Sequence, residues 1–352
     1  MPEVPLRVLI LAGGIGSRFW PLSTPRRPKQ LLPLGSDQPL ISDTVRRARR
    51  VASVDQLFVL TGPAVGRAIQ DETGLPDSAF LLEPEAKGTA PVLAWAAWEA
   101  ARTDPRTVLV SLHADHVIAP EDAFVALLRD GAEVAAARDL LLTVAIPPTR
   151  AEPGYGYIAP GEMLGTTGSA ECLRVDAFVE KPSPDVAQDY VDQGYLWNSG
   201  IFIWTAARFL EEIRATEPAI GSALAHLERG DVEGYFAACP DISVDDAVLA
   251  RSDRVATLRA TFTWDDVGAW EALRRTRESD EAGNVCVGPT HVVDGGRNVV
   301  FADGGPVVLF GVDDLVVVRT GAVTMVTTRE RSPHLKDLLR ELPPELVNPE
   351  GS

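Results

Sequence analysis

The chain has 352 residues, 45% of them hydrophobic and 24% charged, which fits a folded protein of two or three domains and excludes disordered, collagen-like and disulfide-rich classes. Asp and Glu number 50 against 33 Lys and Arg, so the formal charge is −17. A chain this acidic repels phosphate backbones and anionic head groups, so we expect no nucleic acid and no membrane as partners, and a small anionic ligand only at a locally basic or amide-lined site.

The first 150 residues alternate short apolar runs with longer segments of helical spacing. The runs predict strands at 7–12, 57–61, 79–82 and 107–112, and the longer segments predict helices at 40–51, 64–72 and 91–102. Apolar strands that alternate with helices indicate a mostly parallel sheet covered on both faces. Ligands bind such sheets at the carboxyl ends of strands, which is where Gly13, Gly14 and residues 113–116 stand.

The rest of the chain divides into two further patterns. Residues 147 to about 275 are less regular and rich in Gly, Pro and aromatic residues, as expected for a substrate-binding insertion. After Gly283, short β-type runs separated by Gly and Asp turns lead to a predicted helix at 334–342. We therefore expect a catalytic α/β domain over 1–275 and a small β domain with a terminal helix over 284–352. That domain could be a short β-helix, although no fixed-period repeat is visible.

The cysteines and the first residues bear on the compartment. Cys172, Cys239 and Cys286 lie far apart without a CxxC pair, which is typical of a reduced protein, and no HExxH or Cys/His cluster supports zinc. The apolar run near the start is too short for a signal peptide, and no run reaches the length of a membrane span. We expect a cytoplasmic protein.

A glycine-rich segment follows the first predicted strand. It reads LAGGIGSRFWPL at 11–22 and is followed by PRRPKQ at 25–30. Glycines let backbone N–H groups approach phosphate oxygens, and Ser17, Arg18 and Lys29 add donors and positive charge. The glycines alone would also fit an ordinary turn, but together with these side chains they predict a phosphate-binding loop. The spacing fits neither GxGxxG nor GxxxxGK, which excludes a Rossmann dehydrogenase and a P-loop kinase.

This segment resembles the signature of the nucleoside-diphosphate-sugar pyrophosphorylases, and its FWPLS and PKQ parts are similar to the mannose-1-phosphate guanylyltransferases. Seven further segments follow in the family's order and extend the resemblance over about residues 6–345. They are EP at 83–84 with TAP at 89–91, ADH at 114–116, GYGYI at 154–158, FVEKP at 178–182, WNSGIF at 197–202, SVDDA at 243–247 and WDDVG at 264–268.

The resemblance implies a Rossmann-like nucleotidyltransferase domain with a mostly parallel mixed sheet. It also implies the transfer of GMP from GTP to α-D-mannose 1-phosphate, giving GDP-mannose and pyrophosphate. The sugar phosphate would attack the α-phosphorus in line, with Mg²⁺ and without a covalent enzyme intermediate. Because both substrates are strongly anionic, such catalysis depends on positioning and charge neutralisation, and Mg²⁺ is suited to carboxylate and phosphate ligands.

The resemblance also implies roles for single residues. Asp115 and Asp266 match the metal-binding pair, with Asp265 as a neighbouring acid outside it; taken singly, Asp115 could be a turn residue and Asp266 a solvated loop acid. Arg18 and Lys29 would be catalytic with them by neutralising the triphosphate. The nucleotide site would comprise Leu11, Ala12, Gly13, Gly14, Gly16, Ser17, Arg18, Lys29, Glu83 and Thr89. The sugar-phosphate site would comprise Gly156, Tyr157, Glu180, Lys181 and Asn198. Four aromatic residues are instead predicted to be core: Trp197, Phe202, Trp204 and Trp270.

Two positions depart from the family pattern, and two alternatives stay open. Gly88 stands where the family usually has Asn, and His113 where it usually has Pro. One alternative is that the enzyme uses another pair of sugar 1-phosphate and nucleoside triphosphate. The segments FWP at 19–21 and WNS at 197–199 favour the mannose-1-phosphate guanylyltransferases over this alternative. The other is a non-catalytic regulatory subunit that binds GDP-mannose, which loss of Asp115, Asp266 or Arg18 would favour; all three are present. The exposed β domain is a predicted contact for a homodimer.

Overall fold

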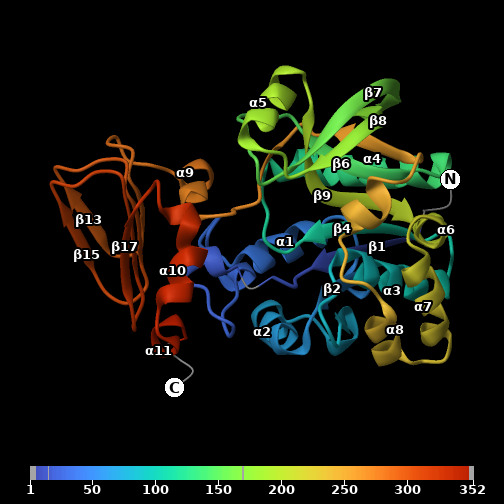
Figure 1. Ribbon diagram of the computed structural model, residues 1–352, viewed down its shortest axis with the longest axis horizontal. Coiled ribbons are helices and arrows are strands. Elements are labelled where there is room, and N and C mark those ends of the chain that lie inside the picture. Colours follow the sequence, from blue (N-terminus) through green and yellow to red (C-terminus); the bar gives the residue numbers. More distant parts are fainter. Residues whose placement is uncertain (1–4, 15, 169, 349–352) are drawn as a thin grey trace.

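The computed structural model describes residues 5–14, 16–168 and 170–348 and is built on one large mixed sheet (Figure 1). The nine strands run in the order β3-β2-β1-β4-β9-β6-β10-β8-β7. The predicted strands of the first part are confirmed and pair in parallel: β1 (Leu6–Leu11), β2 (Leu57–Thr61), β3 (Phe80–Leu82) and β4 (Val108–His113).

The middle of the chain is more regular than its composition predicted, because it supplies most of the other half of the sheet. β9 lies antiparallel between β4 and β6, and bulges break the pairing of β7 with β8 at Pro160 and Gly165, where the sequence looked irregular. The strands of this half are β6 (Leu141–Ile146), β7 (Gly156–Thr167), β8 (Ala170–Glu180), β9 (Leu196–Thr205) and β10 (Val255–Arg259).

Helices cover both faces of the sheet, as the alternating pattern predicted. Along β1, Val8 and Ile10 face one helical layer and Leu9 and Leu11 face the other, since side chains alternate along a strand. The first layer contains α1 (Leu40–Ala48), α2 (Pro63–Thr73) and α4 (Glu121–Arg138). The second contains α3 (Thr89–Ala101), α6 (Ala206–Thr216), α7 (Pro218–Glu228) and α8 (Val232–Ala238). Further helical segments are α5 (Pro184–Asp192), η3 (Val54–Gln56) and η4 (Asp77–Ala79).

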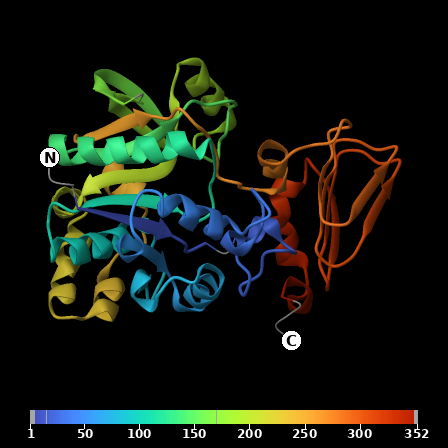
Figure 2. The same ribbon diagram turned by 180° about the vertical axis from the view of Figure 1, so that it is seen from behind.

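The C-terminal strands form a separate stack at one end of the molecule, as Figures 1 and 2 show from opposite sides. Three parallel strands place Val285, Val299 and Val316 at matching positions. Because the separation in sequence differs between the first pair and the second, successive coils differ in length, and no fixed period is visible in the sequence. One sheet contains β12 (Val285–Val287), β14 (Val299–Ala302), β16 (Leu315–Arg319) and β17 (Thr324–Thr328), and the other β13 (Thr290–Val293) and β15 (Val307–Phe310).

A shared apolar cluster joins this stack to the larger part of the molecule. The Trp270 ring lies edge-on to Phe19 at 5.1 Å and 5.8 Å from Phe301, and the Trp20 indole donates to the Val347 carbonyl at 3.2 Å. The C-terminal helices lie between the two parts (Figure 1). The segments involved are η1 (Ser17–Phe19), η6 (Trp270–Ala272), α9 (Leu273–Thr276), η7 (Ser332–His334), α10 (Leu335–Glu341) and α11 (Pro344–Val347). None of the described helices is long and apolar enough to span a membrane.

Candidate active site

The glycine-rich loop begins where β1 ends and is tied to the segment that carries Lys29. Gly16 has a φ of 74°, and a Cβ there would lie 2.2 Å from the Cβ of Lys29, so only glycine allows this close approach. The Ala12 carbonyl accepts hydrogen bonds from Gln30 Nε2 at 3.1 Å and from Thr61 Oγ1 at 2.9 Å. The loop and η2 (Lys29–Leu31) are thereby held as one unit. Gly13 and Gly14 are exposed, and Ile15 lies outside the described residues.

A pair of three-residue strands brings the two predicted metal ligands together. β5 (Val117–Ala119) pairs antiparallel with β11 (Thr263–Asp265), with Val117 opposite Asp265. Asp115 precedes β5 and Asp266 follows β11, so both stand at the same end of this ribbon. Lys29 Nζ contacts both, at 2.6 Å from Asp115 Oδ2 and 2.5 Å from the Asp266 carbonyl oxygen.

The neighbouring acids Asp265 and Asp266 have different partners. Asp265 is buried, accepts from Arg275 Nε at 2.6 Å and Nη2 at 3.1 Å, and accepts from the Val267 amide at 2.8 Å. The Asp266 carboxylate accepts only the Tyr155 hydroxyl, at 2.6 Å, among the residues that the structure describes. Val267 is fully buried with a φ of 47°, which is strained for a β-branched residue. The Asp265 contacts therefore hold a strained turn that presents Asp266.

Burial and charge act in opposite directions on the titratable groups of this site. Burial opposes ionisation of Asp115, but the charges of Lys29, His116 and His113 outweigh it and lower the pKa of Asp115 to about 2. For Asp266 burial wins over Lys29, and its pKa is raised. Burial lowers the pKa of both His113 and His116, and the Trp264 indole donates to His116 Nδ1 at 3.0 Å. One ionised carboxylate thus faces the Lys29 ammonium.

Arg18 lies near the Asp266 carboxylate, because the Cβ position of Gly268 is 3.0 Å from Asp266 Oδ2 and is also close to Arg18. Its Nη1 is 3.3 Å from where a Cβ on Gly268 would lie, and the side chain is exposed. Arg18 makes no hydrogen bond or ion pair with the described part of the chain, so its donors are available to a ligand. The exposed glycines of the loop and the exposed Arg18 guanidinium together offer backbone N–H groups and a positive charge to a ligand, while Lys29 is buried beneath them in its ion pair with Asp115.

The predicted sugar-phosphate residues also converge. A Cβ on Gly156 would lie 2.6 Å from Glu180 Oε2 and 3.3 Å from Asn198 Cβ, so glycine lets β7 approach both side chains. Lys181 has a φ of 47°, is exposed and forms an ion pair with Glu180. Tyr157 differs from the others: its ring is fully buried and its hydroxyl accepts from the Glu152 amide, so only its backbone can line a pocket.

On the nucleotide side, the segment around Thr89 is held by a neighbouring loop. Thr89 begins α3, and its Oγ1 accepts from the Val244 amide at 2.8 Å. A Cβ on Gly88 would lie 2.4 Å from the Ile242 carbonyl oxygen, which explains why glycine stands here. Glu83 is buried, and burial raises its pKa.

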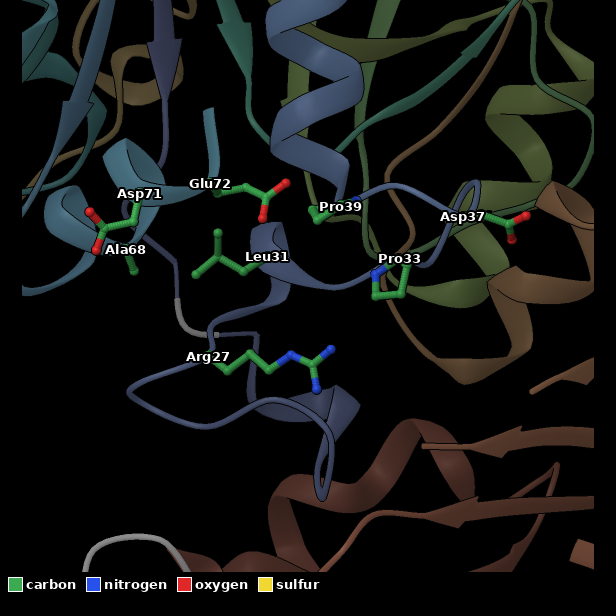
Figure 3. Close-up of a pocket in the computed structure, with 8 residues that line it drawn as sticks. All are labelled: Arg27, Leu31, Pro33, Asp37, Pro39, Ala68, Asp71 and Glu72. Carbon is green, nitrogen blue, oxygen red and sulfur yellow. The ribbon is translucent and has the colours of Figure 1, made fainter. Parts of the chain in front are cut away.

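The open pocket of about 610 Å³ shown in Figure 3 is a different feature. Arg27 and Leu31 flank Lys29 in sequence and line this pocket, together with Asp71 and Glu72 from the end of α2. None of the predicted site residues lines it. Its charged groups already have partners, among them Asp303 for Arg27 at 2.7 Å and Ser42 for Glu72 at 2.7 Å.

Comparisons with known proteins cover nearly the whole chain. The nucleotidyl transferase family model matches residues 7–283, and the MannoseP isomerase/GMP-like β-helix domain model matches 290–342. Mannose-1-phosphate guanylyltransferase of Escherichia coli K12 is 35% identical over 97% of this chain and 74% of its own length. The chain belongs to the nucleotidyl transferase family, among the mannose-1-phosphate guanylyltransferases.

Other proteins that are similar to this chain carry different names. Xanthan biosynthesis protein XanB of Xanthomonas campestris pv. campestris B100 is 35% identical over 95% of this chain and 72% of its own length. The crystal structure described as mannose-1-phosphate geranyltransferase from Thermus thermophilus has a TM-score of 0.89, 32% identity, and covers 96% of this chain and 98% of that one. A Helicobacter pylori mannose-6-phosphate isomerase structure, at 21% identity and a TM-score of 0.60, shares the fold over 74% of this chain and 99% of that one.

Several residues that build the site of this nucleotidyltransferase were not predicted from the sequence. Tyr155 lies inside GYGYI, from which only Gly156 and Tyr157 were predicted to line the pocket, and Gln30 ends the PKQ motif. Arg275 is ten residues from Asp265 and belongs to no motif. The prediction that Trp197, Phe202, Trp204 and Trp270 are core is confirmed, since each is at most 1% exposed.

Proposed function

We propose that the protein transfers GMP from GTP to α-D-mannose 1-phosphate, giving GDP-mannose and pyrophosphate. The observation that carries the proposal is the position of Lys29, which lies against the glycine loop and contacts the Asp115 carboxylate and the backbone carbonyl oxygen of Asp266. That arrangement suits a polyanionic substrate, because it sets a cation beside the two residues that could hold a metal. The substrate pair is supported by the guanylyltransferase relatives at 35% identity.

A divalent metal, for which we propose Mg²⁺, fits the residues present. Asp115 and Asp266 offer hard oxygen donors at one end of the β5–β11 ribbon, and the Lys29 ammonium already lies 2.6 Å from Asp115 Oδ2. A cation is therefore stabilised at this point. When bound, Mg²⁺ would neutralise charge on the triphosphate as the α-phosphorus is attacked.

The chain's own side chains would hold and align the two substrates. The amides of residues 11–14, 16 and 17, with Glu83 and Thr89, would position the nucleotide, while Arg18 and Lys29 would bind its phosphates. Lys181 would hold the sugar phosphate, and Glu180 and Asn198 would orient the sugar ring. A phosphate oxygen of the sugar forms the new bond to the α-phosphorus, and the bond to the bridging oxygen breaks to release pyrophosphate. The nucleophile is already ionised, so no general base is needed.

The proposal extends to domains, assembly and compartment. A catalytic domain over 1–275 and a small β domain with its terminal helix over 284–352 accord with the two matched family models. The Val293–Phe310 pair and Val308 form an exposed apolar face, with Phe310 72% exposed, and a second copy of the chain would cover it in a homodimer. Three free cysteines favour the reducing cytoplasm.

The test is pyrophosphate release with Mg²⁺ for a matrix of sugar 1-phosphates against GTP, ATP, UTP and dTTP. Rapid release only with GTP and mannose 1-phosphate is the expected result. Another winning pair would retain the site and refute the substrate assignment. Tight binding of GDP-mannose with no turnover of any pair would instead favour a regulatory subunit.

A further inference from the structure

A third polar side chain lies beside Glu180 and Asn198, on a segment that the mechanism has not used. Asp245 Oδ1 accepts from Asn198 Nδ2 at 2.8 Å, while Asn198 Oδ1 accepts from Thr143 Oγ1 at 2.8 Å. These two bonds set the orientation of the amide, with its NH₂ group toward Asp245. One N–H of that group remains for a ligand, because a side-chain amide has two.

The pKa of Asp245 is strongly shifted by its surroundings, which is unusual for a residue with a purely structural role. Burial, together with the charge of Glu180, raises the pKa of Asp245 to about 7, even though the Asn198 bond favours ionisation. Two carboxyl groups in a half-buried corner repel each other when both are ionised. Hydroxyl groups that donate to both would relieve this repulsion, and a sugar ring carries such groups on adjacent carbons.

The segment around Asp245 also connects the two halves of the site. Asp245 begins a single π-helical turn, η5 (Asp245–Leu249), a local geometry that is rare and often functional. Just before it, the Ile242 amide donates to the Lys87 carbonyl at 3.1 Å and the Val244 amide to Thr89 Oγ1 at 2.8 Å. The same short segment therefore contacts the predicted nucleotide side through Thr89 and the predicted sugar side through Asn198.

We propose that Asp245 is a positioning and specificity residue for the sugar, which fixes the Asn198 amide and, with Glu180, accepts two neighbouring hydroxyl groups. This inference rests on the proposed function, because it takes the pocket of Glu180 and Asn198 to be the sugar site. A sugar that lacks or misplaces one of these hydroxyls leaves the repulsion between the two half-buried carboxyl groups unrelieved and one acceptor without its donor, which is costly. Asp245 thus makes the pocket selective among sugar 1-phosphates as well as competent to bind them.

The experiment compares steady-state constants of Asp245→Ala and Asp245→Asn with those of the wild type. For Asp245→Ala, KM for mannose 1-phosphate rises about 10- to 100-fold, as expected for loss of a charged hydrogen-bonding group, while KM for GTP changes less than about twofold. The preference in kcat/KM for mannose 1-phosphate over glucose 1-phosphate falls at the same time. For Asp245→Asn, KM for mannose 1-phosphate rises less than for Asp245→Ala, because the amide oxygen of the new side chain still accepts from Asn198.

The adjacent Asp246 provides the matched control. It is exposed and accepts from Ser243 Oγ at 2.8 Å, so Asp246→Asn leaves both KM values unchanged. An unchanged sugar KM in folded Asp245→Ala, or equal rises of KM for both substrates, would overturn the proposal; if Asp245→Ala does not fold, the isosteric Asp245→Asn decides by the same split. Should the wild type prefer another substrate pair, the proposed function fails separately, and the variants are assayed with that pair.

Discussion

Replacing Lys29 with Met removes the ammonium and keeps most of the apolar stem, so it isolates the charge at the centre of the site. The Lys29 side chain is 10% exposed and that of Asp115 30%. The fall in the pKa of Asp115 from 3.8 to about 2 corresponds to about 2 kcal/mol of stability. Because the folded-state pKa is the lower one, this contribution is present above about pH 4 and is lost as the pH falls toward 2. Lys29 makes the largest of the favourable contributions, beside His116 and His113, so Lys29→Met should lower the free energy of unfolding by up to about 2 kcal/mol at neutral pH.

The assay is urea denaturation, with EDTA and then with saturating Mg²⁺, beside pyrophosphate release. In EDTA the variant is less stable than the wild type. Mg²⁺ stabilises the variant more than it stabilises the wild type, because the ammonium no longer competes with the metal for Asp115. The kcat falls by about 10²- to 10³-fold, as for the loss of one group that stabilises developing charge. The exposed Lys336 gives the matched control Lys336→Met, which should change neither quantity. Wild-type stability in EDTA together with a normal kcat would refute this account of Lys29.

Three further predictions concern the supports of the site. Asp265→Asn weakens the Arg275 ion pair that holds the strained Val267 turn, so kcat falls while KM for either substrate changes little, as steady-state assays can test. Trp20→Phe loses the bond to the Val347 carbonyl and should cost about 1 kcal/mol in urea denaturation with kcat nearly unchanged. Asp245→Asn should be more stable than the wild type above pH 7 and equal to it at acid pH, because the raised pKa makes wild-type stability fall as the pH rises from about 4 to 7; denaturation on either side of pH 7 measures this.

The sequence predicted the first half of the sheet well because its strands are buried on both faces. Continuous apolar runs such as 57–61 end at turn residues, and the observed β2 (Leu57–Thr61) has the predicted bounds. The second half was harder to read. β7 is interrupted by Pro160 and Gly165, and its outer part is partly exposed, so its sequence shows neither the hydrophobic period of a strand nor that of a helix. Its pairing depends on neighbours distant in the chain, which local patterns do not contain.

The meeting of the metal ligands shows the same limit more sharply. Lys29 contacts Asp115 and Asp266, which are 86 and 237 residues away. The ribbon that unites the two acids has three residues in each strand, too few for a hydrophobic period to show. The resemblance to a known family identified both acids, since it carries long-range information that residue spacing lacks.

Within a motif, the harder question is which of two adjacent acids faces the substrate. WDDVG and SVDDA each contain two adjacent aspartates, and residue type alone does not show which member of a pair faces the substrate. In the first, the Asp265 carboxylate is paired with Arg275, while the Asp266 carboxylate accepts only from the Tyr155 hydroxyl among the described residues. In the second, Asp246 bonds back to Ser243 while Asp245 reaches Asn198 on β9. The aspartate that bonds to a residue near in the sequence stabilises the turn, and the adjacent aspartate contacts other residues of the site. The partner therefore decides the role, and it becomes known only when the fold brings distant segments together.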